Sequence, residues 1–337
     1  RDFDIYKYSI NLSVYICYYL RLTTKSYRDE FSSEMNGIFK CIFEEIPKKE
    51  QKYIVDNIEM KEGIAKNRAL LENIFSLFVC INAKVPLFIV GKPGCSKSLS
   101  VQLIYNSMKG EEYSDNQIFN NLPKLILSPF QGSLGSTSEG VQKIFKIARK
   151  SLENKNKEKE EIISMVYFDE MGLAEHSPHN PLKVIHAKLD EALDEGKNKI
   201  AFVGISNWTL DASKMNRGMH LSIPEPSEED TKETAFTIGE SYDANLANTY
   251  KGFYENLGLT YFKYKKCLKY SNNGDGKVDF HGNRDFYHLI KYSAREIINF
   301  NKNNSSSNTE EEKKIAFSGL ERNFGGLKFQ AHGSDKE

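Results

Sequence analysis

Short apolar runs separated by stretches of helical periodicity occupy the middle of the chain, from about residue 69 to residue 223. A run of four to eight apolar residues is typical of a buried strand, and apolar positions three or four apart indicate an amphipathic helix. Strands that alternate with helices predict a parallel sheet joined by crossover helices. The predicted strands are residues 86–91 (PLFIVG), 124–130 (KLILSPF), 162–168 (IISMVYF), 199–205 (KIAFVGI) and 219–223 (MHLSI).

Helices are predicted between these strands and before the first of them. Residues 69–81 (ALLENIFSLFVCI) form an amphipathic pattern that leads into the first strand. In the second crossover helix, Ser136 is followed three positions later by Glu139, which is a capping-box signature. The predicted crossover helices are residues 97–108, 136–150, 181–195 and 211–216.

Three regions are predicted along the chain. Residues 55–224 form a nucleotide-binding α/β domain, and residues 225–337 form a smaller, mostly helical lid. Residues 1–54 form a helical segment that we interpret as the end of a preceding module. A stretch rich in Asn, Ser and charge at 301–314 (NKNNSSSNTEEEKK) predicts a disordered insertion in the lid, and residues 274–280 predict a hairpin.

Composition excludes several classes of partner. Lys plus Arg (46) equals Asp plus Glu (46), so net charge favours neither nucleic acid nor an anionic membrane. The most apolar N-terminal stretch, residues 8–20, is shorter than the roughly 20 residues that a spanning helix needs, and acidic residues precede it. Neither a transmembrane segment nor a secretory signal is expected. Arg1 in place of methionine indicates that the natural N-terminus lies further upstream.

Cysteine usage indicates a reducing compartment. The five cysteines (Cys17, Cys41, Cys80, Cys95 and Cys267) have no paired spacing. An odd, dispersed set suits reduced thiols better than a disulfide framework or a zinc site, so a cytoplasmic location is expected.

A phosphate-binding loop is predicted at residues 91–98 (GKPGCSKS), after the first strand and at the start of a helix. Small residues let backbone N–H groups turn toward phosphate oxygens, and the helix N-terminus adds partial positive charge. Lys97 is placed to reach the β- and γ-phosphates, and the Ser98 hydroxyl to hold Mg²⁺. The alternative is a strand–helix turn of chance composition. The predicted nucleotide-binding residues are Gly91, Pro93, Gly94, Cys95, Ser96, Lys97, Ser98 and Leu99.

Two positions of the loop bear on its geometry and reactivity. Ser96 stands where such loops usually have glycine, and serine reaches positive φ angles less readily. Cys95 lies beside Lys97 and a helix N-terminus, which could give its thiol thiolate character, so that alkylation would block nucleotide binding. The simpler interpretation of Cys95 is a tolerated small residue.

An acidic pair follows the third predicted strand. Asp169 and Glu170 emerge after the apolar run 165–168, at the carboxyl edge where open α/β sheets bind ligands. Asp169 is expected to help hold Mg²⁺, and Glu170 to orient the attacking water in phosphoryl transfer. Asn207, after the fourth strand, could position that water or contact the γ-phosphate, or it could simply form a turn.

Two arginines are candidates for transition-state stabilisation. Arg217, just before the fifth strand, is placed at the domain edge, where an arginine can enter a neighbour's site; the alternative is an exposed helix end followed by a Gly cap. Arg284, at the start of a helix in the lid, could reach the phosphates across an interdomain cleft, or it could pair with Asp285 on the surface.

A possible calcium loop at 272–279 (NNGDGKVD) is rejected. In that register Ser271 and Gly282 would occupy loop positions one and twelve, where an EF-hand needs acids, so a Gly-rich hairpin turn fits better. The seven histidines show no metal-ligand spacing.

Taken together, these motifs resemble an ATPase module of the mysterin family. Members of that family are giant RING-type ubiquitin ligases with a dynein-like AAA+ core. The resemblance covers about residues 55–326. It is carried by the runs 63–70 (GIAKNRAL), 91–99 (GKPGCSKSL), 168–178 (FDEMGLAEHSP), 204–208 (GISNW), 214–218 (KMNRG), 284–291 (RDFYHLIK) and 322–326 (RNFGG).

The resemblance implies a P-loop AAA+ three-layer domain with a central five-stranded parallel sheet and a helical lid. It also implies a ring of modules within one polypeptide, with ATP and Mg²⁺ between consecutive modules. Asn207 would be sensor 1, Arg284 sensor 2 and Arg217 the finger, while the segment with Ile64 and Ala65 would lie against adenine. The parent would be a ubiquitin ligase of the cytosol and of lipid droplets, although the chain has no RING-like Cys/His cluster.

Two classes of function remain open, with a third behind them. The first is an ATPase whose hydrolysis moves the parent motor. The second is a module that holds ATP as a structural or regulatory ligand without turnover. The third is a MoxR-like or dynein-like remodelling ATPase unrelated to ubiquitin.

Overall fold

The computed structural model describes residues 2–110, 117–158, 161–194, 200–271, 281–303 and 309–325. The chain divides into two compact units. Unit 1 joins the residues up to Met60 with Arg68–Glu225, and unit 2 joins Lys61–Asn67 with the residues from Pro226 onward. The segment 61–67 therefore belongs to the helical unit, although the sequence-based boundary at residue 55 grouped it with the sheet.

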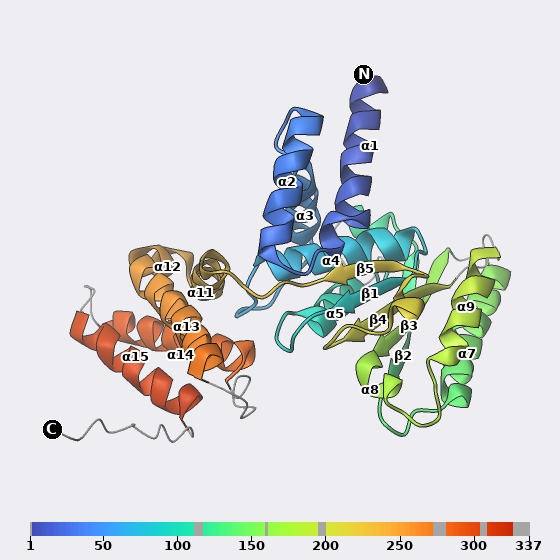
Figure 1. The fold of residues 1–337 in the computed structure, drawn as a ribbon. Helices are drawn as coiled ribbons and strands as arrows, with labels where there is room; N and C mark the ends of the chain where they lie inside the picture. Colours follow the sequence, from blue (N-terminus) through green and yellow to red (C-terminus); the bar gives the residue numbers. More distant parts are fainter. Residues whose placement is uncertain are drawn as a thin grey trace. The chain divides into compact units, whose positions relative to one another are not determined.

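Unit 1 is built on a five-stranded parallel sheet in the order β2-β3-β4-β1-β5 (Figure 1). This confirms the predicted α/β fold class. Each strand overlaps its predicted range: β1 (Leu87–Val90), β2 (Lys124–Gln131), β3 (Ile162–Asp169), β4 (Ala201–Ser206) and β5 (Met219–Ser222). The strand order matters for the site, because the carboxyl ends of β1, β4 and β3 are neighbours.

Helices cover both faces of this sheet, which gives three layers. Phe88, Val166 and Phe202 form one core cluster with residues of α7 and α9, and the Phe145 ring of α7 stacks on Phe202 at 6.0 Å between centroids. The strand residues that alternate with these are also buried, and α4 and α5 contact the sheet there. The helices of this part are α4 (Arg68–Asn82), α5 (Lys97–Ser107), α6 (Gln117–Asn120), α7 (Ser138–Glu158), α8 (Met171–Glu175), α9 (Lys183–Asp194) and α10 (Ala212–Met215).

The predicted capping box at Ser136 is wrong. Helix α7 begins at Ser138, and the Thr137 hydroxyl accepts the Gly140 N–H at 3.2 Å. Ser136 instead accepts the N–H of Ser133 at 2.9 Å and so closes the turn before the helix. The cap therefore lies one residue later than the signature indicated, since a nearby threonine competes for the same role.

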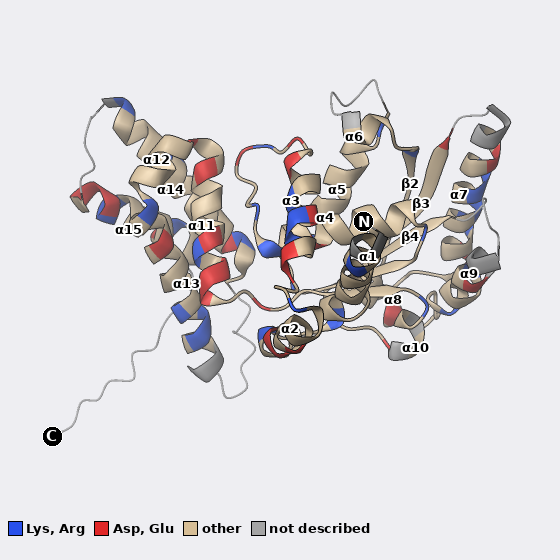
Figure 2. Cartoon of the chain, turned by 90° about the horizontal axis from the view of Figure 1, so that it is seen from above, with Lys and Arg blue, Asp and Glu red and all other residues tan. Residues whose placement is uncertain are grey.

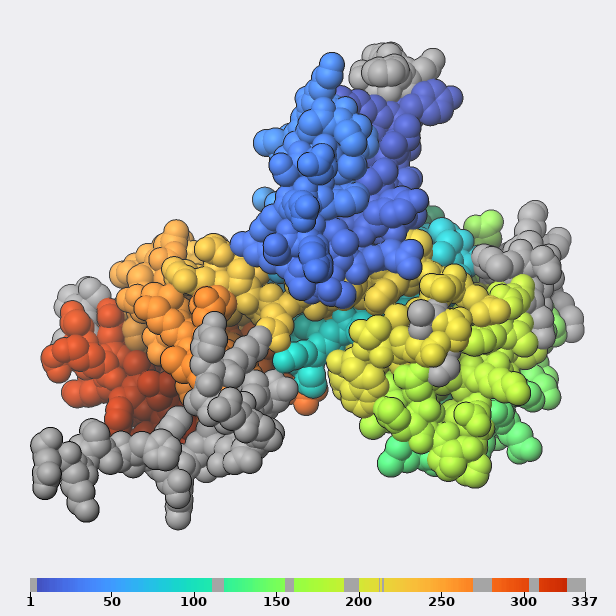
Figure 3. Space-filling view, in the orientation of Figure 1, coloured from blue at the N-terminus to red at the C-terminus, as the bar shows by residue number. Residues whose placement is uncertain are grey.

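The N-terminal helices of unit 1 are α1 (Asp2–Cys17), η1 (Tyr19–Arg21), α2 (Lys25–Phe39) and α3 (Glu45–Asp56) (Figure 3). Within the unit, α3 packs on α4, and α1 and η1 contact β5. An aromatic cluster fills their interior, with Tyr15 stacked on Tyr19 at 4.7 Å and Phe43 against both rings. Arg28 of α2 is fully buried and pairs with Glu72 of α4, so this layer is joined to the sheet domain by charge as well as by packing.

Unit 2 consists of helices around a separate apolar core. Its helices are α11 (Glu228–Tyr242), α12 (Ala244–Thr249), α13 (Lys251–Ser271), α14 (Asn283–Asn303) and α15 (Thr309–Phe324). The Tyr261 and Phe286 rings stack at 4.4 Å in that core. Acidic and basic residues are interspersed along α11 and α15 (Figure 2). Within the described part of the chain, no helix is long and apolar enough to cross a membrane.

The insertion predicted at 301–314 is helical at both of its described ends. Helix α14 continues to Asn303, and α15 begins at Thr309. Glu310, Glu311 and Glu312 lie in the first turn of α15, where negative charge is favoured by the helix dipole, and this explains why a charged stretch forms a helix. Residues 304–308, like the predicted hairpin at 274–280, lie outside the described residues.

Candidate functional site

The loop between β1 and α5 has the backbone of a phosphate cradle. Gly94 adopts φ +83° and Ser96 adopts φ +61°, so serine takes the left-handed conformation that glycine usually supplies. Gly91 cannot carry a side chain, because a Cβ there would lie 2.9 Å from both the Cys95 Sγ and the Ile223 Cβ. The loop therefore keeps the predicted geometry despite Ser96, at the modest cost of one strained non-glycine residue.

Lys97, at the start of α5, is held by acceptors of the loop itself. Its ammonium donates to the carbonyl oxygens of Gly91 and, at 3.0 Å, of Lys92. It also donates to the Asn207 Oδ1 at 3.0 Å, although the two residues are 110 positions apart. The side chain is buried but touches no carboxylate in these bonds. Among the described residues, its charge is therefore balanced by dipoles and a long contact to the Cys95 sulfur, which suits a group that can turn to an anion.

The acidic pair lies beside this lysine. Ser98 Oγ donates to Asp169 Oδ2 at 3.3 Å, and Asn207 Nδ2 donates to Glu170 Oε2 at 2.9 Å. The structure therefore brings Lys97, Ser98, Asp169, Glu170 and Asn207 together as one connected set, which we call the phosphate-loop network. Its members come from the carboxyl ends of β1, β3 and β4, as the strand order requires.

Glu170 is positioned by a strained backbone and a close glycine. Its φ is +52°, a left-handed conformation that costs a non-glycine residue energy. Gly132, at the end of β2, donates its N–H to the Asp169 carbonyl at 2.8 Å, and a Cβ on Gly132 would lie 2.3 Å from the Glu170 carbonyl oxygen. Gly132 therefore allows the turn that directs the Glu170 side chain, a role that sequence analysis missed.

Cys95 does not have the thiolate character that its neighbours suggested. Its side chain is 8% exposed and donates to the Lys92 carbonyl at 2.9 Å. Burial raises the pKa of the Cys95 thiol and outweighs the lowering by Lys97. The Cys95 carbonyl accepts from Asn73 Nδ2 at 2.9 Å, so this residue fixes the loop. Rapid alkylation at Cys95 is accordingly no longer expected.

Sequence analysis missed two further polar groups of the site. Asn73 of α4 is fully buried and holds the loop through the Cys95 carbonyl. Tyr167 donates its hydroxyl to Asp169 Oδ2 at 2.7 Å, and burial, with added effects of the nearby carboxylates, raises the pKa of Tyr167. A signal for Tyr167 was present in the sequence, since residues two apart on a strand face the same side.

Arg217 is engaged within unit 1. Its Nε donates to both carboxylate oxygens of Asp190 on α9, at 2.9 and 3.0 Å, and its Nη1 donates to the Ser213 carbonyl at 3.1 Å. Its side chain is 35% exposed. The structure therefore holds this predicted finger in a partly exposed ion pair near the end of α9.

The remaining predicted site residues belong to unit 2. The segment with Ile64 and Ala65 is held there, because Gly63 N–H donates to Ser241 Oγ at 2.8 Å and Ala65 packs on the core of that unit. Arg284 is exposed at the start of α14 and makes no ion pair with another described residue. Asp285 does not pair with it; its Oδ2 accepts the Gly282 N–H at 2.8 Å.

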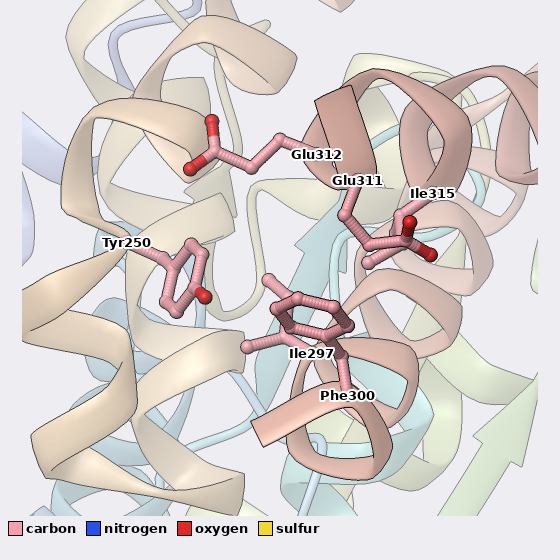
Figure 4. A pocket seen from close by; sticks show the side chains of 6 residues that line it. All are labelled: Tyr250, Ile297, Phe300, Glu311, Glu312 and Ile315. Carbon is pink, nitrogen blue, oxygen red and sulfur yellow. The ribbon is translucent and has the colours of Figure 1, made fainter. Parts of the chain in front are cut away.

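A small hollow in unit 2 is unrelated to these residues. It lies between α14 and α15 and is lined by Tyr250, Ile297, Phe300, Glu311, Glu312 and Ile315 (Figure 4). Glu311 is paired with Lys314 at 3.2 Å, and the Tyr250 hydroxyl accepts from Asn301 at 3.1 Å. The lining thus combines apolar and aromatic side chains with two glutamates. No group of three or more His, Cys, Asp or Glu among the described residues is arranged to hold a metal ion.

A phosphate loop after β1, an acidic pair after β3 and an asparagine after β4, on a sheet of this strand order, define a P-loop domain of the AAA+ class. Residues 63–230 match the family model described as the RNF213 AAA domain. The chain contains an AAA+ module of the RNF213, or mysterin, family.

Curated relatives agree with that assignment. The chain is 37% identical over 297 residues to the E3 ubiquitin-protein ligase rnf213-beta of Danio rerio, covering 83% of this chain and 6% of that protein. It is 36% identical over 293 residues to the E3 ubiquitin-protein ligase RNF213 of Homo sapiens, covering 84% and 5%. The chain thus spans only about a twentieth of the relatives it matches.

A solved structure of the Aeropyrum pernix ORC2 protein, in ADPNP–ADP complexes, is also similar. Its TM-score is 0.44 at 13% identity, over 74% of this chain and 66% of that one. A similarity this weak does not contribute to the assignment, which rests on the strand order and the family match.

Proposed function

We propose that unit 1 binds ATP with Mg²⁺ at the phosphate-loop network, and that the chain hydrolyses ATP as one module of a longer mysterin-type polypeptide. The observation that carries the proposal is the connection of Lys97 to Glu170 through Asn207, with bonds of 3.0 and 2.9 Å. A lysine that binds phosphate and a carboxylate that activates water are thereby joined through one amide.

The donor set at Ser98 and Asp169 fits a magnesium ion. Mg²⁺ takes oxygen ligands at 2.0–2.1 Å in octahedral geometry, so neighbouring ligands are about 2.9 Å apart. The Ser98 hydroxyl and the Asp169 carboxylate oxygen lie 3.3 Å apart, so little movement is needed for both to reach one ion. When bound, the ion would neutralise charge on the β- and γ-phosphates.

Each residue of the network has a defined task in this proposal. Lys97 turns from the Gly91 and Lys92 carbonyls to the phosphates, and this frees the Asn207 amide oxygen. Glu170 accepts a hydrogen bond from the attacking water and orients it in line with the leaving phosphate. Asn207 remains a donor to Glu170 and holds it in that direction.

Further roles follow from the family membership. Arg217 would exchange its Asp190 partner for the nucleotide of an adjacent module and act as a finger there. Arg284 would contact the γ-phosphate as sensor 2, and the segment with Ile64 and Ala65 would hold adenine. The parent would be a ubiquitin ligase in the cytoplasm and at lipid droplets, with adjacent AAA+ modules and the ubiquitin machinery as partners.

Nucleotide binding is tested with Lys97→Ala and a matched control, Lys92→Ala. Lys92 lies in the same loop, but its side chain is half exposed and pairs with Glu225 at 2.9 Å. Loss of a charge-assisted bond costs about 1.5–3 kcal/mol, so Mg-ATP affinity should fall at least about tenfold for Lys97→Ala. Lys92→Ala should bind like the wild type. Equal binding by both variants would contradict the proposed site.

Hydrolysis is tested separately with Glu170→Gln. The amide keeps the size of the side chain but cannot accept the proton of water, so the variant should bind ATP and retain it uncleaved. The measurement is the ratio of ATP to ADP bound to the protein, taken at the time at which the wild type has completed one turnover. Identical nucleotide content in the variant and the wild type would favour the second class of function, in which ATP is held without turnover.

A further inference from the structure

The Asp169 carboxylate is held at both of its oxygens by this chain. Oδ2 accepts from the Tyr167 hydroxyl at 2.7 Å and from Ser98 Oγ at 3.3 Å. Oδ1 accepts from the Glu170 backbone N–H at 2.9 Å. One oxygen therefore has two hydroxyl donors, and the shorter bond is the one from Tyr167.

The place of Tyr167 in the sheet explains why it can reach this carboxylate. It lies two residues before Asp169 on β3, so both side chains face the same side of the strand. Its neighbours across the sheet are Pro129 of β2 and Val203 of β4, and the residue is half buried. Its strand position therefore directs the ring to the face that carries Asp169, and its hydroxyl reaches the phosphate-loop network there.

We propose that Tyr167 is a positioning residue that orients the Asp169 carboxylate for a divalent cation bound with the nucleotide. The inference rests on the proposed function, because the cation is the one that Ser98 and Asp169 would share. When the Ser98 hydroxyl turns to that cation, it leaves Asp169 Oδ2. The Tyr167 hydroxyl is then the side-chain donor that remains on this oxygen, and it keeps the carboxylate from rotating.

The expected size of the effect follows from other cation sites. Groups that hold a metal-binding carboxylate or histidine in place are worth about 10- to 100-fold in metal affinity. Tyr167→Phe removes only the hydroxyl and keeps the ring between its strand neighbours. The cation affinity of the nucleotide complex should therefore fall about tenfold, whereas affinity for nucleotide without a cation should stay the same.

A purely structural tyrosine would behave differently. Removal of a satisfied, half-buried hydroxyl lowers the stability of the chain. It would leave the cation dependence of nucleotide binding unchanged. The two roles are therefore separated by a cation titration, and thermal unfolding alone does not distinguish them.

The experiment uses the full chain and a fluorescent adenine nucleotide, with Mn²⁺ as the cation. Nucleotide affinity is measured first in excess EDTA and then across a Mn²⁺ titration, with bound Mn²⁺ followed directly by electron paramagnetic resonance. The variants are Tyr167→Phe, Asp169→Asn as the loss of a ligand, and Tyr53→Phe as the matched control. Tyr53 is 58% exposed on α3 of the same unit.

The supporting result is that Tyr167→Phe needs about tenfold more Mn²⁺ for half-maximal cation binding than the wild type and Tyr53→Phe do. The nucleotide affinities of all three proteins in EDTA should be equal. A midpoint within about twofold of the wild type, while Asp169→Asn loses the cation, overturns this inference and leaves the proposed function standing. Absence of any cation-dependent binding by the wild type overturns both.

Discussion

Two polar networks of unit 1 both centre on a buried cation, but they use it in opposite ways. Arg28 donates to both Glu72 oxygens, at 2.7 and 2.9 Å, and to the carbonyls of Ser222 and Leu22 at 2.7 and 3.1 Å. Its guanidinium also lies over the Tyr19 ring at 4.9 Å. We call this set the Arg28 cluster. Lys97, in contrast, has only carbonyl and amide acceptors besides a long contact to a thiol.

This difference in hydrogen-bond partners indicates which of the two networks can rearrange. The Arg28 guanidinium donates through Nη1 to both oxygens of one buried carboxylate and through Nη2 and Nε to two carbonyls, so it cannot leave without exposing a buried charge. An ammonium is a compact point charge whose donors rotate, and the neutral acceptors around Lys97 would lose little if it turned to a phosphate as proposed above. The Arg28 cluster therefore fixes the N-terminal helices to the sheet, and the phosphate-loop network remains free to change partners.

The largest effect is expected from breaking the Arg28 cluster. Arg28→Met leaves the Glu72 carboxylate buried without its cation, which costs about 3–5 kcal/mol in the free energy of unfolding. Chemical denaturation of the full chain measures it. The paired change Arg28→Met with Glu72→Leu removes both charges and should recover much of the loss. A double variant no more stable than the single one would show that packing, and not the ion pair, dominates there.

A smaller effect on stability is expected when the charge of Lys97 is removed. Lys97→Met keeps the aliphatic stem and removes the ammonium, so that only neutral acceptors lose a partner and no charge is left buried alone. The free energy of unfolding should fall by about 1 kcal/mol or less, while Mg-ATP binding is lost. Chemical denaturation tests the predicted stability, and nucleotide titration of the same sample tests the predicted loss of binding. A loss of stability as large as that of Arg28→Met would contradict the proposed difference between the Arg28 cluster and the phosphate-loop network.

The smallest effect is expected at Arg217. Its pair with Asp190 is partly exposed, and such pairs contribute about 0–1 kcal/mol. Arg217→Ala should therefore leave stability and nucleotide binding by this chain almost unchanged. If Arg217 acts on an adjacent module, ATP turnover should fall only when that module is attached. Turnover measured on the chain with and without its neighbour separates these cases.

The elements and the phosphate-loop network followed well from the sequence, because both depend on local pattern. Each strand overlaps its predicted range, and the loop, Asp169, Glu170 and Asn207 converge as parallel strand ends must. The roles given to Arg217, Arg284 and the segment with Ile64 and Ala65 stay predictions.

The Arg28 cluster could not have been predicted in the same way. Arg28 and Glu72 are 44 positions apart, and each sits in an ordinary helical pattern where a charged residue suggests a solvated face. Only the fold, which brings the Arg28 side chain of α2 to Glu72 of α4 and to the Ser222 carbonyl of β5, turns them into a buried pair. Gly132 was missed for a related reason, since its importance comes from the close approach of Glu170, a contact between two loops.

Trp208 gives this protein an intrinsic optical reporter. It is the only tryptophan of the chain and directly follows Asn207. Its indole lies against Gly172, where a Cβ would approach the ring to 2.5 Å, and its centroid is 5.9 Å from that of the His176 ring. Emission from an indole depends on the polarity and quenching groups around it. If Lys97 turns to a phosphate as proposed, the change at Asn207 should therefore be readable in unlabelled protein, in real time, from this one fluorophore.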